Sequence, residues 1–140
     1  MSTPTATSVN QPPSRVRIPF VEHLGIRLLE QSAARAAVVL EKRPEQLNSW
    51  GAAHGGVVMT MLDYVMSAAV RGHYGLDGGV LTVDLSVGFM NAATSATIQA
   101  EGRVLHGGGS TAFCEGEARD EAGKLLAKAI GTFRLIQDRR

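Results

Sequence analysis

Residues 48–56, with the sequence NSWGAAHGG, end in two glycines that begin a long apolar run, and a single carboxylate, Asp63, lies inside that run. The first N–H groups of a helix have no partner within the helix and lie at its positive end, so they bind negatively charged oxygen. A carboxylate in an apolar environment can act as a general base or a nucleophile. The two features together predict acyl-transfer chemistry.

Gly55 and Gly56 are the candidate donors at the start of this helix. Glycine lets a ligand approach the backbone closely. A thioester or ester oxygen at either N–H would be stabilised as negative charge develops on it. The alternative is that the glycines only permit close packing of the turn, and the spacing alone leaves both interpretations open.

Asp63 has a structural alternative as well, because buried acids often accept hydrogen bonds from a neighbouring loop. Burying a charge without a partner is costly, however, and the helix offers no basic residue near Asp63 in the sequence. We therefore favour a functional role for this carboxylate.

The separation of Gly55 and Asp63 predicts a dimer. Asp63 follows Gly55 by eight residues, which places them roughly 12 Å apart along one helix axis. A single thioester carbonyl cannot contact both groups. If both serve one reaction, the acid comes from a second copy of the chain, and a two-fold dimer with antiparallel helices supplies it twice. We expect an obligate homodimer with two shared sites.

Asn48 and His54 belong to the loop before the helix. The Asn48 amide either donates to the substrate oxygen or fixes a water, or it holds its own backbone in a turn. His54 either orients the loop or caps the helix. We favour positioning over proton transfer for His54, since the segment has no serine or cysteine arranged as a nucleophile.

The helix that positions these groups is expected over residues 54–71 and is expected to end at Gly72. Apolar residues recur with helical spacing at Val58, Leu62, Val65 and Ala69, and further apolar residues widen the stripe on both sides. A helix that is apolar almost all round is buried on most sides.

Shorter elements surround that helix. Residues 18–24 predict a helical turn, 26–30 and 34–41 two short strands, and 43–53 a loop. Strands are also expected over 81–89, 96–104, 110–119 and 124–135, separated by turn signals, so these four are expected to form an antiparallel meander. Together these elements predict an α+β domain in which a curved antiparallel sheet of about six strands wraps one long central helix.

Composition narrows the class of protein. The 140 residues fit one domain, with 44% hydrophobic and 19% charged residues, as in soluble globular proteins. The net charge of +1 gives no electrostatic case for nucleic acid or membrane. The single cysteine, the absence of a long apolar run and the absence of a signal-peptide pattern favour the cytoplasm. Residues 1–17 are expected to be a disordered leader, and 18–137 the domain.

The spacing Asn-x-x-Gly-x-x-His-Gly-Gly, with an acid nine residues after the histidine, resembles the hotdog-fold acyl-CoA thioesterases of the PaaI-like (phenylacetyl-CoA thioesterase) group. The resemblance extends through residues 82–85 and 123–133 and covers roughly residues 20 to 136. The matching motif residues are Asn48, Gly51, His54, Gly55, Gly56 and Asp63.

This resemblance implies a hotdog fold, dimers often paired into homotetramers, and hydrolysis of acyl-CoA thioesters with no cofactor beyond the coenzyme A of the substrate. It implies that Asp63 is the nucleophile or general base, that Gly55 supplies the oxyanion N–H with help from Asn48, and that Thr82 assists the attacking water. Ser67, one turn after Asp63, either hydrogen-bonds that carboxylate or only packs.

Further residues are candidates for binding the substrate. The turn at residues 107–111 resembles the hairpin that lies along the coenzyme A moiety in this family, which implicates Gly108, Gly109, Ser110 and Thr111; its alternative is a plain flexible hairpin. Coenzyme A phosphates have candidate partners in Arg71, Arg103 and Arg134. Methionines adapt to varied groups, so the acyl pocket is expected to be lined by Met59, Met66, Phe89 and Met90, with core packing as the alternative.

Other functions remain open. A hotdog enoyl-CoA hydratase or dehydratase would use His54 with Asp63 of the partner subunit to move a proton on carbon, and a non-catalytic module would only bind acyl-CoA. No Gly-x-Ser-x-Gly elbow, dinucleotide fingerprint or P-loop occurs. The four histidines are scattered, so no metal site is expected. An aryl-CoA and a medium- or long-chain acyl-CoA are equally compatible substrates.

Overall fold

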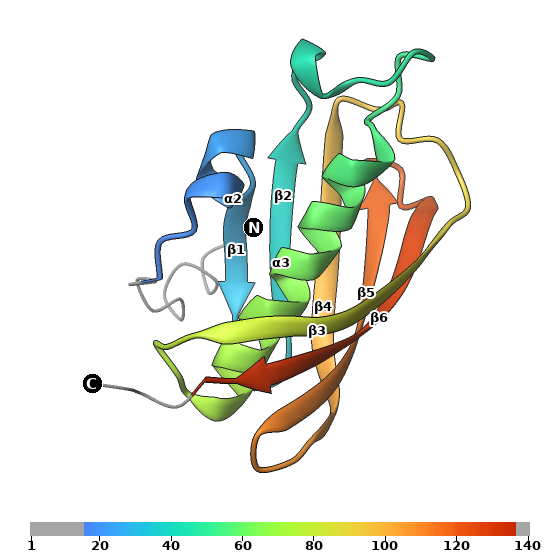
Figure 1. Ribbon diagram of the computed structural model, residues 1–140. Coiled ribbons are helices and arrows are strands. Elements are labelled where there is room, and N and C mark those ends of the chain that lie inside the picture. The colour runs from blue at the N-terminus through green and yellow to red at the C-terminus, as the bar shows by residue number, and fades with distance from the viewer. Residues whose placement is uncertain (1–15, 137–140) are drawn as a thin grey trace, which may run out of the picture.

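A computed structural model describes residues 16–136 as one curved antiparallel sheet wrapped around one long helix (Figure 1). A short helix and two strands come first: α2 (Pro19–Leu24), β1 (Arg27–Gln31) and β2 (Ala36–Glu41). The 3-10 turn η1 (Pro44–Gln46) precedes the long helix α3 (Gly55–Tyr74). Four longer strands follow: β3 (Val80–Phe89), β4 (Thr97–Gly107), β5 (Thr111–Asp120) and β6 (Leu125–Leu135). The predicted α+β hotdog architecture is confirmed. The expected leader lies outside the described residues except for its last two.

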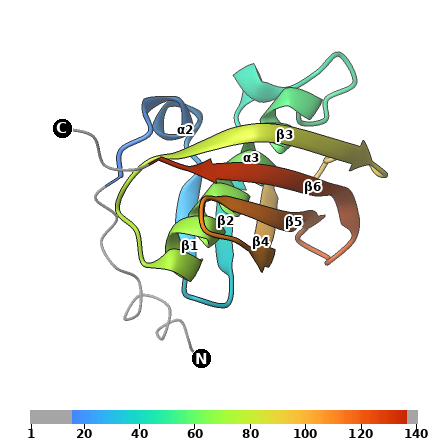
Figure 2. The ribbon, with the colours of Figure 1, turned by 60° about the horizontal axis from the view of Figure 1, so that its bottom comes forward.

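The strand order is β1-β2-β4-β5-β6-β3, so the predicted meander of the last four strands is wrong. Only β4, β5 and β6 follow one another in space; β3 pairs with β6 instead of β4. Strand β4 pairs with β2 along the whole of β2, from Ala36 opposite Gly102 to Glu41 opposite Thr97. Alternation of apolar residues identifies strands but does not choose their partners. Consequently β3 is an edge strand (Figure 2).

Helix α3 continues to Tyr74 and ends at Gly75, whose φ is 68° and whose N–H donates to Arg71 O. The expectation that Gly72 ends the helix is therefore wrong. A Cβ atom at Gly72 would lie 2.4 Å from the carbonyl oxygen of Ser32, in the turn between β1 and β2. The glycine is needed for this close approach of helix to turn, not for a helix end.

Small residues on the inner face of the sheet bring it against the helix. Gly102 and Gly116 are opposite each other on β4 and β5, and a Cβ atom at Gly102 would lie 3.0 Å from Val65 O. Helix α3 fills the resulting space with its large residues, and Met61, Leu62, Val65 and Met66 are all fully buried. The helix is therefore covered on most sides, as predicted, and Met66 is a core residue instead of part of an open acyl pocket.

Strand β3 departs from the expected alternation at one position. Thr82 is opposite Phe133 and Asp84 is opposite Thr132, so a bulge falls at Val83. Before the bulge Thr82 faces α3, and after it Leu85 and Val87 pack against the core. Leu81 and Val83 are 57% and 60% exposed. The bulge changes which alternate residues face the helix, and this allows a polar residue of β3 to reach the site.

Candidate functional site

The first turn of α3 leaves one backbone donor without an acceptor among the described residues. His54 N–H donates to Gln46 O at 2.8 Å, Gly56 N–H to His54 Nδ1 at 2.8 Å, and Val57 N–H to His54 O at 2.9 Å. Only the Gly55 N–H in this turn has no such partner, and it lies at the positive end of a helix that continues to Tyr74. Of the two glycines, Gly55 is thus the one available to a substrate oxygen.

His54 is the N-cap of α3 and its side chain is exposed. Because Nδ1 accepts the Gly56 N–H, Nδ1 carries no proton, and in the neutral ring the proton lies on Nε2. The ring therefore presents an N–H donor to its surroundings. For Nε2 to accept a proton from a substrate, the neutral ring would have to carry its own proton on Nδ1. Two donors, Nδ1–H and the Gly56 N–H, would then face each other. The geometry supports the positioning role for His54.

Asn48 holds its own turn. Its side-chain Oδ1 accepts from Trp50 N–H at 2.8 Å and from Ala52 N–H at 3.1 Å, and Gly51 takes a φ of 79°. Nδ2 donates to no acceptor among residues 16–136. The two expected arrangements of Asn48 are therefore compatible: the oxygen maintains the loop and the amide N–H remains available. The same turn exposes 88% of Trp50.

Asn48 and Gly55 line one surface groove, which has a volume of about 350 Å³. Phe89, the last residue of β3, and Met90, which follows it, also line this groove. A Cβ atom at Gly55 would lie 3.5 Å from Phe89 Cζ. Phe89 therefore lies next to Gly55, whereas Met59 is exposed one turn further along α3.

Asp63 is half-buried near the middle of α3 and accepts a hydrogen bond of 2.7 Å from Thr82 Oγ1 on β3. No cationic side chain of the described part of the chain lies within ion-pair distance of it. Because Gly55 and Asp63 belong to one uninterrupted helix, the two groups are about 12 Å apart along its axis. The structure thus brings Asp63 to Thr82 but not to Gly55 of the same chain.

Ser67 does not bind Asp63. Its hydroxyl donates to Tyr64 O at 2.8 Å and accepts from an Arg71 guanidinium nitrogen at 3.3 Å. Arg71 Nε also donates to Gly78 O at 3.1 Å, and burial lowers the pKa of Arg71. Both side chains are buried. Of the two alternatives for Ser67, the structure shows packing and no hydrogen bond to Asp63. Arg71 is buried, whereas a phosphate ligand would be exposed.

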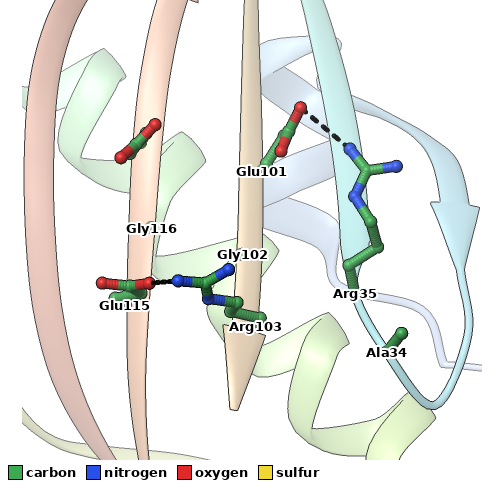
Figure 3. Close-up of a pocket in the computed structure, with 8 residues that line it drawn as sticks. Ala34, Arg35, Glu101, Gly102, Arg103, Glu115 and Gly116 are labelled. Carbon is green, nitrogen blue, oxygen red and sulfur yellow. Dashed lines mark ion pairs between the residues drawn. The ribbon is translucent and has the colours of Figure 1, made fainter. Parts of the chain in front are cut away.

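Arg103 lies on the other face of the sheet, away from α3. It pairs with Glu115 beside a hollow of about 360 Å³, where Arg35 also pairs with Glu101 at 2.9 Å (Figure 3). Because Glu115 already compensates the charge of Arg103, the structure does not support Arg103 as a ligand of a coenzyme A phosphate. Arg134 is exposed on β6, opposite Thr111.

The hairpin between β4 and β5 is fixed to the C-terminal end of α3. Tyr74 donates its hydroxyl proton to Gly108 O at 2.8 Å, and Gly108 N–H donates to Thr111 O at 2.8 Å. Gly109 and Ser110 form the tip of this turn, and Ser110 O accepts from Leu135 N–H at 2.9 Å. The hairpin therefore lies at the opposite end of α3 from Gly55 of its own chain.

A second groove, which sequence analysis missed, includes His54 and Gly56 in its lining. It has a volume of about 500 Å³ and lies between α2, η1 and the start of α3. Its most exposed apolar side chain is Phe20, which is 59% exposed. In the sequence, the only signal for this groove is an apolar residue, Phe20, in the short segment expected to be a helical turn.

Among residues 16–136, no group of three or more His, Cys, Asp or Glu side chains is arranged to hold a metal ion. No helix within the same range combines the length and apolarity needed to cross a membrane.

Known proteins resemble this chain in both sequence and fold. The model of the thioesterase superfamily matches residues 51–127. A protein of Archaeoglobus fulgidus named "Putative esterase" is 31% identical over 119 residues, covering 84% of this chain and 75% of that protein. A conserved protein of Pseudomonas aeruginosa superposes with a TM-score of 0.84 at 25% identity, covering 90% and 100% of the two chains.

A mutant of the phenylacetic acid degradation protein PaaI from Thermus thermophilus superposes with a TM-score of 0.76 at 25% identity, covering 85% of this chain and 100% of that one. The family model spans the Gly55 donor, Asp63 and Thr82 together. The chain belongs to the thioesterase superfamily and is a PaaI-like hotdog protein.

Proposed function

We propose that the protein hydrolyses acyl-CoA thioesters to a free acid and coenzyme A at a site shared by two protomers. The observation that carries this proposal is the free N–H of Gly55 at the start of α3, with the Asp63 carboxylate fixed two turns further along the same helix. An oxyanion donor and a carboxylate that can act as base or nucleophile are together able to catalyse thioester hydrolysis.

In the proposed reaction the thioester oxygen accepts from the Gly55 N–H, and the Asn48 amide supports it. Asp63 of the partner subunit removes a proton from water, whose oxygen attacks the carbonyl carbon. The tetrahedral oxyanion then collapses, the C–S bond breaks, and the thiolate of coenzyme A takes the proton from Asp63. In the nucleophilic alternative the Asp63 carboxylate attacks the carbonyl carbon, the C–S bond breaks, and the thiolate of coenzyme A leaves. Water then hydrolyses the resulting anhydride to the free acid and the Asp63 carboxylate, and a proton released from that water passes to the thiolate.

The open edge of the sheet at strand β3 supports the proposed dimer. Strand β3 has unpaired backbone groups on one side, and Leu81 and Val83 are exposed along it. Such an edge is a template for pairing with another chain. On α3, Met59 is exposed and Asp63 half-buried, so this stripe of the helix is not covered by its own sheet. Antiparallel pairing of two such helices brings Asp63 of the partner subunit to Gly55.

The same arrangement gives the hairpin at residues 107–111 a role. The hairpin lies beyond the C-terminal end of α3, and an antiparallel partner helix carries it toward Gly55 of the first protomer. The coenzyme A moiety then leaves the shared site along this hairpin. Association of two dimers into a tetramer, and a cytoplasmic location, also remain predictions.

The test is coenzyme A release from acetyl-, phenylacetyl-, benzoyl-, octanoyl- and palmitoyl-CoA. We expect the wild type to release it and Asp63→Asn to lose about 10²–10⁴ in rate. Glu101→Gln is the matched control, because it makes the same carboxylate-to-amide change on the opposite face of the sheet. A fully active Asp63→Asn protein would remove Asp63 from the mechanism.

The shared site is tested with two inactive variants, Asp63→Asn and Gly55→Pro. The two proteins are mixed, unfolded and then refolded together. Half of the dimers are then mixed, and each holds one intact site of two, so about a quarter of the wild-type activity returns. If acid and donor acted within one chain, the mixture would stay inactive.

The hydratase alternative needs His54 as a proton acceptor, and the cap to Gly56 N–H opposes that role. Hydration of crotonyl-CoA, measured beside hydrolysis, separates the two reactions. A module that only binds acyl-CoA would release no coenzyme A from any thioester in the series.

A further inference from the structure

We propose that Arg71 and Ser67 form a clamp that fixes the start of β3. The clamp keeps Thr82 where its hydroxyl donates to Asp63, so its two members are positioning residues of the candidate site. This inference rests on the proposed function and deepens it, because it adds two residues that act on the carboxylate through Thr82. Neither side chain of the clamp hydrogen-bonds to Asp63 itself.

The connection between α3 and β3 has little rigidity of its own. It contains Gly75, Gly78 and Gly79 within five residues, and glycine restricts the backbone least of all residues. A Cβ atom at Gly75 or Gly78 would meet nothing within 4 Å, so packing does not restrain these two positions either. The start of β3 therefore depends on hydrogen bonds for its position.

Arg71 takes part in three of these hydrogen bonds. Its carbonyl oxygen accepts from Gly75 N–H and, at 2.9 Å, from Leu76 N–H. Its Nε donates to Gly78 O at 3.1 Å. One residue thus holds both ends of the connection, the turn that leaves α3 and the glycine two residues before β3 (Figure 1).

Ser67 fixes the direction of the Arg71 guanidinium. Its Oγ accepts from Arg71 Nη1 at 3.3 Å and donates to Tyr64 O at 2.8 Å, so the hydroxyl is itself held by the helix. Ser67 lies one turn before Arg71 on α3, and this spacing brings the two side chains together. A planar guanidinium bound through two of its nitrogens keeps one orientation.

The charge of Arg71 is buried without a carboxylate beside it. The residue is 8% exposed, and no carboxylate within residues 16–136 lies at ion-pair distance from it. Burying a charge in this way costs stability, and an apolar side chain of similar size is often better tolerated at such a position. Packing therefore does not explain an arginine here, whereas a need for donors in two directions does.

The part of β3 next to the clamp is short. Residues 80–82 pair with β6 before the bulge, and β6 is the one neighbour of β3 in the described sheet. A shift of one residue would turn Thr82 away from α3. The bond from Arg71 to Gly78 opposes such a shift, because it fixes the number of residues between the helix and the bulge. Thr82 therefore keeps its contact of 2.7 Å with Asp63.

The experiment introduces Arg71→Met and Ser67→Ala, each alone and combined with Thr82→Val. Arg35→Met is the matched control, because it makes the same change at an arginine that pairs with Glu101 on the opposite face of the sheet. We measure kcat and KM for the thioester that the wild type hydrolyses fastest, and the urea midpoint of each protein. Gly78 is exposed, so its carbonyl can bind water when Arg71 is absent, and Ser67→Ala is the milder second variant.

We expect Arg71→Met to lower kcat about three- to tenfold, which is part of the effect of losing the Thr82 hydroxyl, while KM and the urea midpoint change little. Ser67→Ala should lower kcat by a smaller factor. Combined with Thr82→Val, neither change should cost more than about a further twofold, because the contact through which they act is already absent. Arg35→Met should stay within about twofold of the wild type.

Two results would overturn the clamp. If the loss of kcat in Arg71→Met multiplies with the loss in Thr82→Val, Arg71 does not act through Thr82. If Arg71→Met and Ser67→Ala are both as active as the wild type, the start of β3 does not need the clamp.

Backbone hydrogen exchange keeps the clamp distinct from the proposed function. Exchange of residues 79–82 should be about tenfold faster in Arg71→Met than in the wild type or Arg35→Met, because the start of β3 opens more often. A wild type that releases no coenzyme A but shows this difference retains the clamp and loses the activity. A wild type that hydrolyses thioesters, with exchange at residues 79–82 unchanged in both clamp variants, retains the activity and loses the clamp.

Discussion

Thr82 Oγ1 donates a hydrogen bond of 2.7 Å to Asp63 Oδ1, and this contact links the edge strand β3 to the middle of α3. A carboxylate oxygen with a fixed donor keeps one orientation, and its second oxygen remains available for water or a thioester carbon. The bulge at Val83 makes this contact possible because it places Thr82 on the helix side of β3.

Thr82→Val removes this hydrogen bond while keeping the shape of the side chain. A hydrogen bond to a charged group contributes about 1.5–3 kcal/mol, so we expect kcat to fall roughly tenfold to a hundredfold. Thr82→Ser keeps the hydroxyl and should retain most of the activity. Steady-state kinetics on the best thioester provide the measurement. A Thr82→Val protein as active as the wild type would show that the hydroxyl does not contribute.

Gly55→Pro removes one N–H group with little other change. Proline is accepted at the first position of a helix, and His54, with a ψ of 141°, has the extended conformation that a following proline requires. Loss of an oxyanion donor costs about 10²–10³ in kcat. Gly55→Ala keeps the donor, and its Cβ meets Phe89 only at ordinary contact distance, so it should stay active. Comparable activity of the proline and alanine variants would refute the donor role.

The local part of this site was predictable from sequence. Two glycines before an apolar run indicate a helix start, and the spacing to Asp63 follows from helix geometry. Spacing alone did not distinguish Gly55 from Gly56, although the family resemblance pointed to Gly55. The structure separates them because Gly56 N–H donates to the side chain of His54. Thr82 faces the helix because of the bulge at Val83. A bulge cannot be recognised from the alternation of apolar residues in one strand, because it is defined by the pairing with the partner strand.

Tertiary contacts decided between the two alternatives for Ser67 and explain the remaining differences from the predicted fold. Ser67 has the right spacing to reach Asp63, but a hydroxyl on a helix can bond to a backbone carbonyl three or four residues earlier, and Ser67 bonds to Tyr64 O. The pairing of β3 with β6 joins segments far apart in sequence. The second groove is formed by α2, η1 and α3 together, so no single segment predicts it.

Gly72→Ala tests the close approach of α3 to the turn between β1 and β2. In an open helix this change stabilises by about 1 kcal/mol. Here the new Cβ would lie 2.4 Å from a backbone oxygen, and such overpacking costs about 1–3 kcal/mol. We therefore expect a lower urea midpoint. Gly78→Ala, where nothing lies within 4 Å of the added Cβ, is the control. A more stable Gly72→Ala protein would contradict the predicted clash.

Cys114 connects burial with alkaline stability. Its thiol is fully buried on the inner face of β5, and burial raises its pKa to about 12. In the unfolded chain the thiol ionises near its ordinary pKa of about 8.5. Below that pH neither state loses the proton, so the thiol adds no pH dependence. Between about pH 8.5 and 12 only the unfolded chain loses it, and the free energy of unfolding therefore decreases as the pH rises.

Cys114→Ala removes this contribution, although it also lowers stability at every pH by leaving a small cavity. The difference between the two proteins should accordingly be largest at pH 7.5 and narrower at pH 10, as measured by urea unfolding at both values. Native wild-type protein should also resist a thiol reagent at pH 8, since reaction needs an exposed thiolate. A difference that does not change with pH, or rapid labelling of the folded protein, would show that the thiol is not shielded by the sheet and helix.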